Sequence, residues 1–525
     1  MCFDFIRRRE NEDIISDKKE DVMDFYTTTI DDILCEKTGE LGELVSLLQL
    51  PLQNDEILKN TRETIKNFLS VLRKELTVVV ETHYVDRMYR DSYYYMYSKM
   101  SLGYNRYCLR LSFVDCKIAD DELMDYKKVN EMSCHYLGFL VLRPLLARCI
   151  GRNVISPKAL DSRANIRRIS ICEVEVPTSV CGVSVSVKGF PHCSQDTETM
   201  SCAESTLWAI MEYYSYKSPL HKLILPSEIH SVLASTSKER QLPSQGLLFE
   251  QISTVLCHCG FECVMYSNEE WKNSDITFKE VFSCYVESGI PLAVCIKTAD
   301  NEYHAVVCIG KQDTELTNIF NENPMGTNQQ GWKFNRWNKC LQDFVFCDDN
   351  RPCYQRVSFN KPTDCYNDAK KWGDGTITHF IAPLPKKVYL DAKSAIAISN
   401  SILTDVKNLP EGTCVRTFLT SCRSFTDFIV RESGWSVEDK NYFVGLKMPK
   451  YIWVTEFADL YTFQNGYANG LLILDATGQA DTSSMIYYRT KSCVSYYDDY
   501  EKKLVELSKD DGKKIKLFHR NLNNY

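Results

Sequence analysis

Residues 195–214 read Q-D-T-E-T-M-S-C-A-E-S-T-L-W-A-I-M-E-Y-Y, and the second half of this stretch predicts an amphipathic helix. Ser201 and Glu204 have the S-x-x-E spacing of a capping box, which makes Ser201 the N-cap and Cys202 the first helical residue. A thiol at this position meets unpaired backbone N–H groups and the positive end of the helix dipole, and both favour the thiolate. Cys202 is therefore the candidate nucleophile, although most free cysteines are only small buried hydrophobic residues.

Residues 289–310 read G-I-P-L-A-V-C-I-K-T-A-D-N-E-Y-H-A-V-V-C-I-G, which predicts a β-hairpin. Two β-rich runs, 290–297 and 304–309, flank a short polar connection. His304 begins the second run, where an imidazole can be partly exposed and still rigidly held, as a general base requires. A lone histidine at a strand end is more often a plain surface residue, so the functional hypothesis depends on Cys202 and His304 together.

A glutamine shortly before a cysteine at a helix start, followed by a strand that begins H-A-V-V-x-I-G, resembles the papain-like cysteine peptidases. The resemblance is closest to the bacterial branch that includes the bacteriocin-processing (double-glycine) peptidases. Between the two stretches, three segments follow the order of elements in that branch: R-Q-L-P-S-Q-G-L-L-F-E-Q-I (240–252), C-G-F-E-C (259–263) and E-S-G-I-P-L (287–292). The resemblance covers roughly residues 180–385.

The resemblance implies a papain-like α+β fold, in which a helical subdomain and an antiparallel sheet flank the active-site cleft. It also implies that Cys202 attacks an acyl carbon and that His304 takes and returns the proton. Gln195 would bind the oxyanion with its side-chain amide, together with the backbone N–H of Cys202. Gln195 precedes Cys202 by seven residues, where the family usually has six. The loop must therefore bulge by one residue, or another donor must serve.

A neutral histidine base needs a partner that fixes its tautomer and ring orientation. The candidates downstream of His304 are Asn321 and Asn323 in N-I-F-N-E-N-P, and Asp348 and Asp349 in D-F-V-F-C-D-D-N. The two aspartates directly follow an apolar strand. We favour Asp348, because an acid that ends a buried strand is otherwise hard to explain. A plain turn formed by Asp-Asp-Asn is the alternative.

The chain of 525 residues exceeds the length of one ordinary domain. We expect an N-terminal α+β domain of unknown role (1–165), the papain-like domain (166–385) and a C-terminal α+β accessory domain (386–525). Residues 84–113 interleave tyrosines with arginines and a lysine. This mixture predicts an interlocked core with snorkelling arginines, or less often a site for an anionic ligand.

A net charge of −8 and a pI near 5.7 argue against a nucleic-acid partner. The sequence contains no apolar run long enough for a signal peptide or a membrane span. Its 23 cysteines are scattered rather than arranged as a disulfide framework, which favours a reducing, bacterial cytoplasm. Cys257, His258, Cys259 and Cys263 lack a matching second pair of ligands for zinc. No nucleotide-binding motif is present, so we expect neither a metal nor a cofactor.

The sequence thus predicts a thiol hydrolase, most simply a cysteine peptidase that acts on a protein or peptide through Cys202, His304, Asp348 and Gln195. The same residues would support a deamidase, a transglutaminase or an acyltransferase, because these differ in the acceptor that resolves the acyl-enzyme. A binding module that keeps the fold without catalysis is a third hypothesis. Regulation by a partner of the N-terminal domain is a further one.

Overall fold

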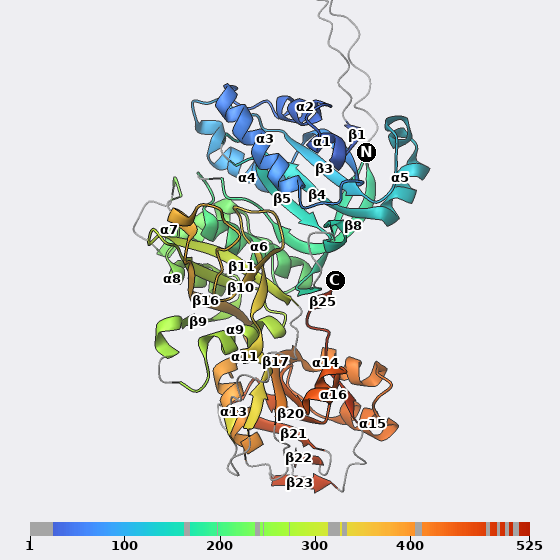
Figure 1. Ribbon diagram of the computed structural model, residues 1–525, viewed down its shortest axis with the longest axis vertical. Helices are drawn as coiled ribbons and strands as arrows, with labels where there is room; N and C mark the ends of the chain where they lie inside the picture. Colours follow the sequence, from blue (N-terminus) through green and yellow to red (C-terminus); the bar gives the residue numbers. More distant parts are fainter. Residues whose placement is uncertain are drawn as a thin grey trace, which may run out of the picture.

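The computed structural model describes residues 25–146, 148–161, 168–196, 198–236, 242–244, 246–271, 274–312, 326–327, 333–404, 412–478, 484–490, 494–498, 503–507 and 514–525. The chain is an α+β protein with helices packed on largely antiparallel sheets, which confirms the predicted fold class at that level. Its three large sheets lie one below another in Figure 1, in the order in which they occur along the chain. No helix among the described residues is both long and apolar enough to cross a membrane.

The N-terminal sheet has the antiparallel order β1-β2-β3-β4-β5-β8-β7. Its strands are β1 (Phe25–Thr29), β2 (Thr77–Tyr84), β3 (Cys108–Val114), β4 (Tyr136–Leu142), β5 (Ile150–Ile155), β7 (Val174–Val180) and β8 (Val183–His192). Its helices are α1 (Ile30–Leu34), α2 (Glu40–Leu47), α3 (Asp55–Leu69), α4 (Arg87–Tyr95) and α5 (Tyr126–Met132). Strands β3 and β4 are buried along their whole length, so this sheet is covered on both faces.

The tyrosine-rich segment forms an interlocked core around Tyr89 and Tyr97, as predicted, but Arg110 does not snorkel to the surface as expected, because its guanidinium is buried. Tyr89 and Tyr97 are buried and pack against one another with ring centroids 6.1 Å apart. Arg110 is equally buried, and its guanidinium lies over the rings of Tyr84 and Phe139 while it donates hydrogen bonds to Thr178 and Ser179. An arginine held in this way by aromatic faces, a hydroxyl and a backbone oxygen stabilises the sheet.

The central sheet has the order β15-β14-β11-β10-β16-β9, with β6 paired to β11 and β25 paired to β6. Its strands are β6 (Ile169–Ile171), β9 (Phe261–Ser267), β10 (Leu292–Lys297), β11 (Tyr303–Gln312), β14 (Asp343–Cys347), β15 (Gln355–Ser358), β16 (Thr376–Pro385) and β25 (Asn523–Asn524). The accompanying helices are α6 (Cys202–Lys217), α7 (Pro226–Thr236), α8 (Phe249–His258), α9 (Phe278–Glu287), α11 (Trp337–Cys340) and α12 (Ala369–Trp372). The predicted hairpin is confirmed, because β10 pairs antiparallel with β11.

The C-terminal sheet has the order β12-β13-β17-β18-β20-β21-β22-β23, in which only the pair of β13 and β17 is parallel among the described strands. Its strands are β12 (Gly326–Thr327), β13 (Lys333–Arg336), β17 (Thr413–Ser421), β18 (Tyr451–Ala458), β20 (Gly470–Asp475), β21 (Met485–Arg489), β22 (Val494–Asp498) and β23 (Lys503–Leu507). Helices α13 (Ala392–Thr404), α14 (Cys422–Arg431), α15 (Val437–Gly445) and α16 (Leu460–Gln464) cover it, and β19 (Tyr467–Ala468) pairs separately with β24 (Ile515–Lys516).

Sheet membership differs in three places from the three residue ranges expected from sequence. Strand β25 falls within 386–525, but it pairs with β6 of the central sheet. Strands β7 and β8 fall within 166–385, but β8 pairs with β5 and so extends the N-terminal sheet. Strand β13 falls in the same range, but it pairs with β17 of the C-terminal sheet. The alternation of Val and Ser over 183–187 predicts a strand, yet a local pattern carries no information on which sheet accepts that strand.

A buried ion-pair network joins the central and C-terminal sheets. Glu287, at the end of α9, accepts hydrogen bonds from Arg416 (2.6 Å) on β17, from Trp337 (3.1 Å) and from Lys311 on β11. Burial opposes ionisation of Glu287, but the charges of Arg416 and Lys311 lower its pKa to about 2. Glu456 shares Arg416, and burial raises its pKa to about 7.

We predict that Glu287→Gln lowers the free energy of unfolding by about 3–5 kcal/mol, because Arg416 and Lys311 lose their buried counter-charge. Since the folded-state pKa of Glu287 lies below the ordinary 4.5, its contribution is present above pH 4.5 and disappears as pH falls from 4.5 to 2. Glu456 titrates between 7 and 4.5, outside that window. Denaturant unfolding of wild type and variant at several pH values measures both effects. Glu438→Gln, on an exposed residue of α15, is the control; an equal loss in both variants would refute the prediction.

Candidate active site

Helix α6 begins as the capping box predicts. Ser201 is the N-cap: its hydroxyl accepts the N–H of Ala203 (3.3 Å), and Glu204 accepts the N–H of Ser201 (3.0 Å). Cys202 is the first helical residue and is partly exposed. Its backbone N–H is one of the helix N-terminal donors that have no carbonyl partner within the helix. The sequence therefore predicted both the position and the surroundings of this thiol.

His304 approaches Cys202 because β11 extends beyond its neighbour β14. Strand β14 ends at Cys347, which pairs with Val307, so the first residues of β11 have no partner on that side. There the N–H of Ala305 points to the sulfur of Cys202 at 3.5 Å, and hydrogen bonding to the same thiol is one of the causes that raise the pKa of His304. The His304 side chain is buried, so the strand holds it rigidly.

The residues directly after β14 contact the other side of the His304 imidazole. Nε2 of His304 lies 2.9 Å from Oδ1 of Asp348 and 3.5 Å from Oδ1 of Asp349. Asp348 is further fixed by the Tyr366 hydroxyl on Oδ2 (2.6 Å) and by the Asn350 N–H on Oδ1 (3.0 Å). The geometry thus separates the two aspartates and gives the orienting position to Asp348. Asn321 and Asn323 lie outside the described residues.

The charges in this cluster reinforce one another. Burial alone would lower the pKa of His304, but the negative charge and hydrogen bond of Asp348 raise that pKa well above its ordinary value. Burial would likewise raise the pKa of Asp348, but His304, Tyr366 and the Asn350 N–H lower it. Burial, opposed by His304 and aided by the charge of Asp348, raises the pKa of Asp349 to about 7. The result is an imidazolium paired with one ionised carboxylate.

Gln195 lies in the same cleft as Cys202, and a neighbouring amide holds its side chain. Its Nε2 donates to Oδ1 of Asn350 (3.1 Å), which also accepts from Arg148 (2.5 Å). An amide nitrogen carries two hydrogens, so the second remains available to a ligand in the cleft. The Asp196 carboxylate accepts the N–H groups of Glu198, Thr199 and Met200, and this turn spans the seven-residue separation.

The N-terminal sheet contributes directly to this loop. Arg143, at the end of β4 and fully buried, donates hydrogen bonds to the carbonyl oxygens of Ser194 (2.9 Å) and Gln195 (3.2 Å). Arg148, between β4 and β5, reaches the cleft and binds Asn350. Sequence reasoning missed both arginines, because nothing local marks them. Asn350 could have been found, since it ends the Asp-Asp-Asn turn.

The cleft that contains Cys202, Gln195 and His304 has a volume of about 650 Å³. Tyr366 and Trp372 form one wall, with rings stacked at 3.8 Å and an interplanar angle of 8°. The edge of His304 meets Trp372 at 5.2 Å and 79°. A cleft of this size with one apolar wall and convergent polar groups is typical of a binding site for part of a larger ligand.

Potential metal ligands of His304, Asp348 and Asp349 lie within 4.8 Å of one another. Both oxygens of Asp348 already accept hydrogen bonds, so protons suffice to hold the cluster together. The cysteines around 257–263 do not bring three ligand atoms together in the same way within the described residues. The expectation of a site that works without metal therefore stays a prediction.

No protein-family model matches this chain, and no curated protein matches it in sequence comparison.

We predict that His304 titrates well above 6.5 in the folded protein and that Asp348→Asn lowers its pKa, because removal of the carboxylate charge leaves burial as the dominant effect. NMR titration of ring-labelled histidine measures this. His192, which burial holds below its ordinary pKa, is a reference in the same spectrum. Asp349→Asn, which removes a weaker influence on His304, is the matched control. A larger shift in Asp349→Asn than in Asp348→Asn would contradict the assignment.

Proposed function

We propose that this protein is a thiol hydrolase of papain-like fold and that it cleaves peptide bonds with Cys202, His304, Asp348 and Gln195. The single observation that carries the proposal is that Cys202 and His304 line one cleft, with the N–H of Ala305 on the Cys202 sulfur and the Asp348 carboxylate on Nε2 of His304. An imidazole in that position can accept the thiol proton on one nitrogen while the carboxylate stabilises the resulting cation on the other.

The same geometry supplies each step of hydrolysis. The Cys202 thiolate attacks the carbonyl carbon, and the oxygen becomes an oxyanion between the Cys202 N–H and the free amide hydrogen of Gln195. His304 then protonates the leaving amine as the carbon–nitrogen bond breaks, which leaves a thioester. Water attacks that thioester while His304 takes its proton, and the thiolate is released. The buried Asp348 keeps the ring orientation through both transfers.

The arrangement of elements supports the papain-like part of the proposal. Helices α6, α7 and α8 precede the antiparallel strands β10, β11, β14 and β16, and the thiol comes from the helical part while the imidazole comes from the sheet. All described cysteines are free thiols, which agrees with the reducing, cytoplasmic setting that we propose. A protein or peptide substrate is part of the proposal, and a partner of the N-terminal sheet stays a hypothesis.

We predict that the wild-type protein converts members of a diverse peptide library and that Cys202→Ser lowers the rate at least about 1,000-fold. Mass spectrometry of the products identifies the chemistry. New termini support a peptidase. A side-chain mass gain of about 1 Da, from loss of ammonia and gain of water, would indicate a deamidase, and addition of an amine with loss of ammonia would indicate a transglutaminase. No turnover by wild-type protein with any peptide would favour the non-catalytic binding module.

Removal of the oxyanion donor gives a separate prediction. Gln195→Ala should lower kcat about 100- to 1,000-fold with little change in KM, because the amide acts on the transition state rather than on the bound substrate. Gln53→Ala, which truncates an exposed glutamine far from the cleft, is the matched control and should leave both constants unchanged. Equal kcat in Gln195→Ala and wild type would remove Gln195 from the mechanism.

A further inference from the structure

A second cavity lies where the central sheet meets the C-terminal sheet, at the end of α6 opposite to Cys202. Its volume is about 600 Å³. Tyr214 and Lys217 line it from α6, Gly260 from the turn before β9, Lys450 from the approach to β18, and Asn521 from the C-terminal segment. The length of α6 separates it from the catalytic cleft by roughly 20 Å. It is therefore independent of the proposed peptidase site.

The described residues that line this cavity include five cations and neither Asp nor Glu. The cations are Lys217, Lys386, Lys387, Lys450 and Arg520. The whole chain carries a net charge of −8, so the charge of this cavity is opposite in sign to that of the protein as a whole. Clustered like charges repel one another and raise the free energy of the folded state unless an anion offsets them.

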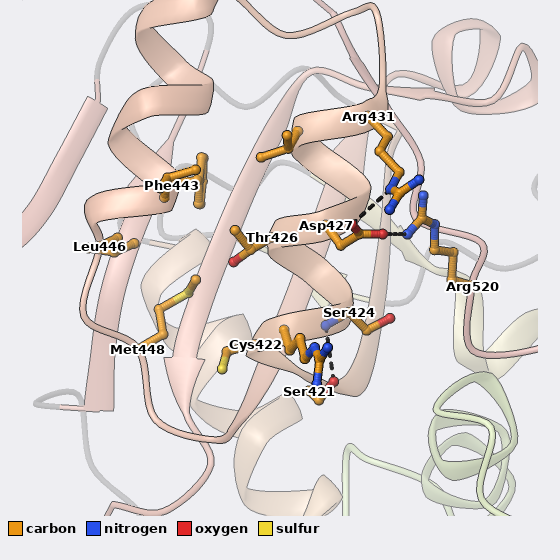
Figure 2. A pocket seen from close by; sticks show the side chains of 13 residues that line it. Ser421, Cys422, Ser424, Thr426, Asp427, Arg431, Phe443, Leu446, Met448 and Arg520 are labelled. Atoms are coloured by element: carbon orange, nitrogen blue, oxygen red, sulfur yellow. Dashed lines mark hydrogen bonds and ion pairs between the residues drawn. The ribbon is translucent and has the colours of Figure 1, made fainter. Parts of the chain in front are cut away.

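The four lysines form no ion pair with any carboxylate among the described residues. The ammonium groups of Lys217 and Lys450 lie over the rings of Tyr213 (5.8 Å) and Tyr451 (5.4 Å), contacts that leave their charge uncompensated. Arg520 differs, because it binds Asp427 at 2.5 Å. Figure 2 shows this pair in the adjoining pocket, where Asp427, on α14, also binds Arg431. The charges of the lysines therefore remain available to a ligand.

The start of α14 adds to the positive field. Ser421 is its N-cap and accepts the N–H of Ser424 (3.1 Å), and both serines line the cavity as well as the adjoining pocket in Figure 2. The first N–H groups of a ten-residue helix favour negative charge next to them. This end of the helix thus reinforces the lysines.

We propose that this cavity binds a small molecule with two adjacent phosphate groups. Lysine binds phosphate as a point charge, which accommodates several oxyanion geometries. Four lysines spread over three segments match a diphosphate better than a single carboxylate. Leu220, which is 72% exposed, and the ring of Tyr451 offer contacts to an organic group attached to the phosphates. Free pyrophosphate and a nucleoside diphosphate share the required chemistry.

Isothermal titration calorimetry of the full chain tests this proposal with two probes, inorganic pyrophosphate and adenosine diphosphate. We expect saturable one-to-one binding of at least one probe, weakened about 100-fold or more in Lys386→Gln/Lys387→Gln, because each lost charge-assisted hydrogen bond costs about tenfold in affinity. Lys37→Gln/Lys59→Gln removes the same charge from exposed lysines of the N-terminal unit and should bind like wild type.

The outcomes separate the sources of the phosphate. If both probes bind with equal affinity, the site recognises only the diphosphate group. If adenosine diphosphate binds more tightly, Leu220 and Tyr451 also contact the organic group. Absence of saturable binding for both probes would overturn the proposal, as would an equal loss of affinity in the two lysine variants. Thermal unfolding of each variant shows that it is folded. Neither result depends on catalysis by Cys202, so failure here leaves the proposed peptidase function intact.

Discussion

The buried contact between His304 and Asp348 is the constraint on which the candidate site depends. Two charged groups at this depth are stable only because each satisfies the other, because the Asn350 N–H also donates to Oδ1 of Asp348, and because the Tyr366 hydroxyl donates to Oδ2. The pair fixes which ring nitrogen faces the carboxylate, and it thereby leaves the other nitrogen for the thiol of Cys202. Orientation and charge thus come from the same interaction.

The difference in length between two neighbouring strands makes this contact. Because β14 ends opposite Val307, the first residues of β11 have no strand partner on that side. They contact α6 and the turn that follows β14 instead. Helix α6 then delivers the thiol with its unpaired N–H groups. The sheet contributes His304 and, directly after β14, Asp348, and the helix contributes Cys202, so the site exists only when sheet and helix are packed together.

The N-terminal sheet is part of the same construction. Arg143 holds the backbone of the loop that carries Gln195, and Arg148 holds Asn350, which in turn holds the Gln195 amide. Arg143 and Arg148, which follow β4 of the N-terminal sheet, therefore position Gln195 and Asn350 in the cleft of the central sheet. A change in how that sheet packs would reach Gln195 through these contacts, which gives the hypothesis of regulation through the N-terminal unit a physical route.

Local signals account for what could be predicted from the sequence. The capping box placed Cys202, the polar connection placed the hairpin that carries His304, and an acid after an apolar strand indicated Asp348. Arg143, Arg148 and Tyr366 had no such signal, because their roles arise from strand pairing and chain crossings far along the sequence. The assignment of β7 and β8 to the N-terminal sheet is of the same kind, since alternation predicts a strand and not its partner.

Alkylation of Cys202 by iodoacetamide at neutral pH, followed by intact-mass and peptide analysis, tests the central claim most directly. We expect that Cys202, although only partly exposed, reacts faster than the exposed thiols, and that His304→Ala slows its reaction at least about tenfold, because the imidazole no longer takes the proton. His258→Ala, which removes an exposed histidine, should react like wild type. Equal rates at Cys202 in wild type and His304→Ala would contradict the account.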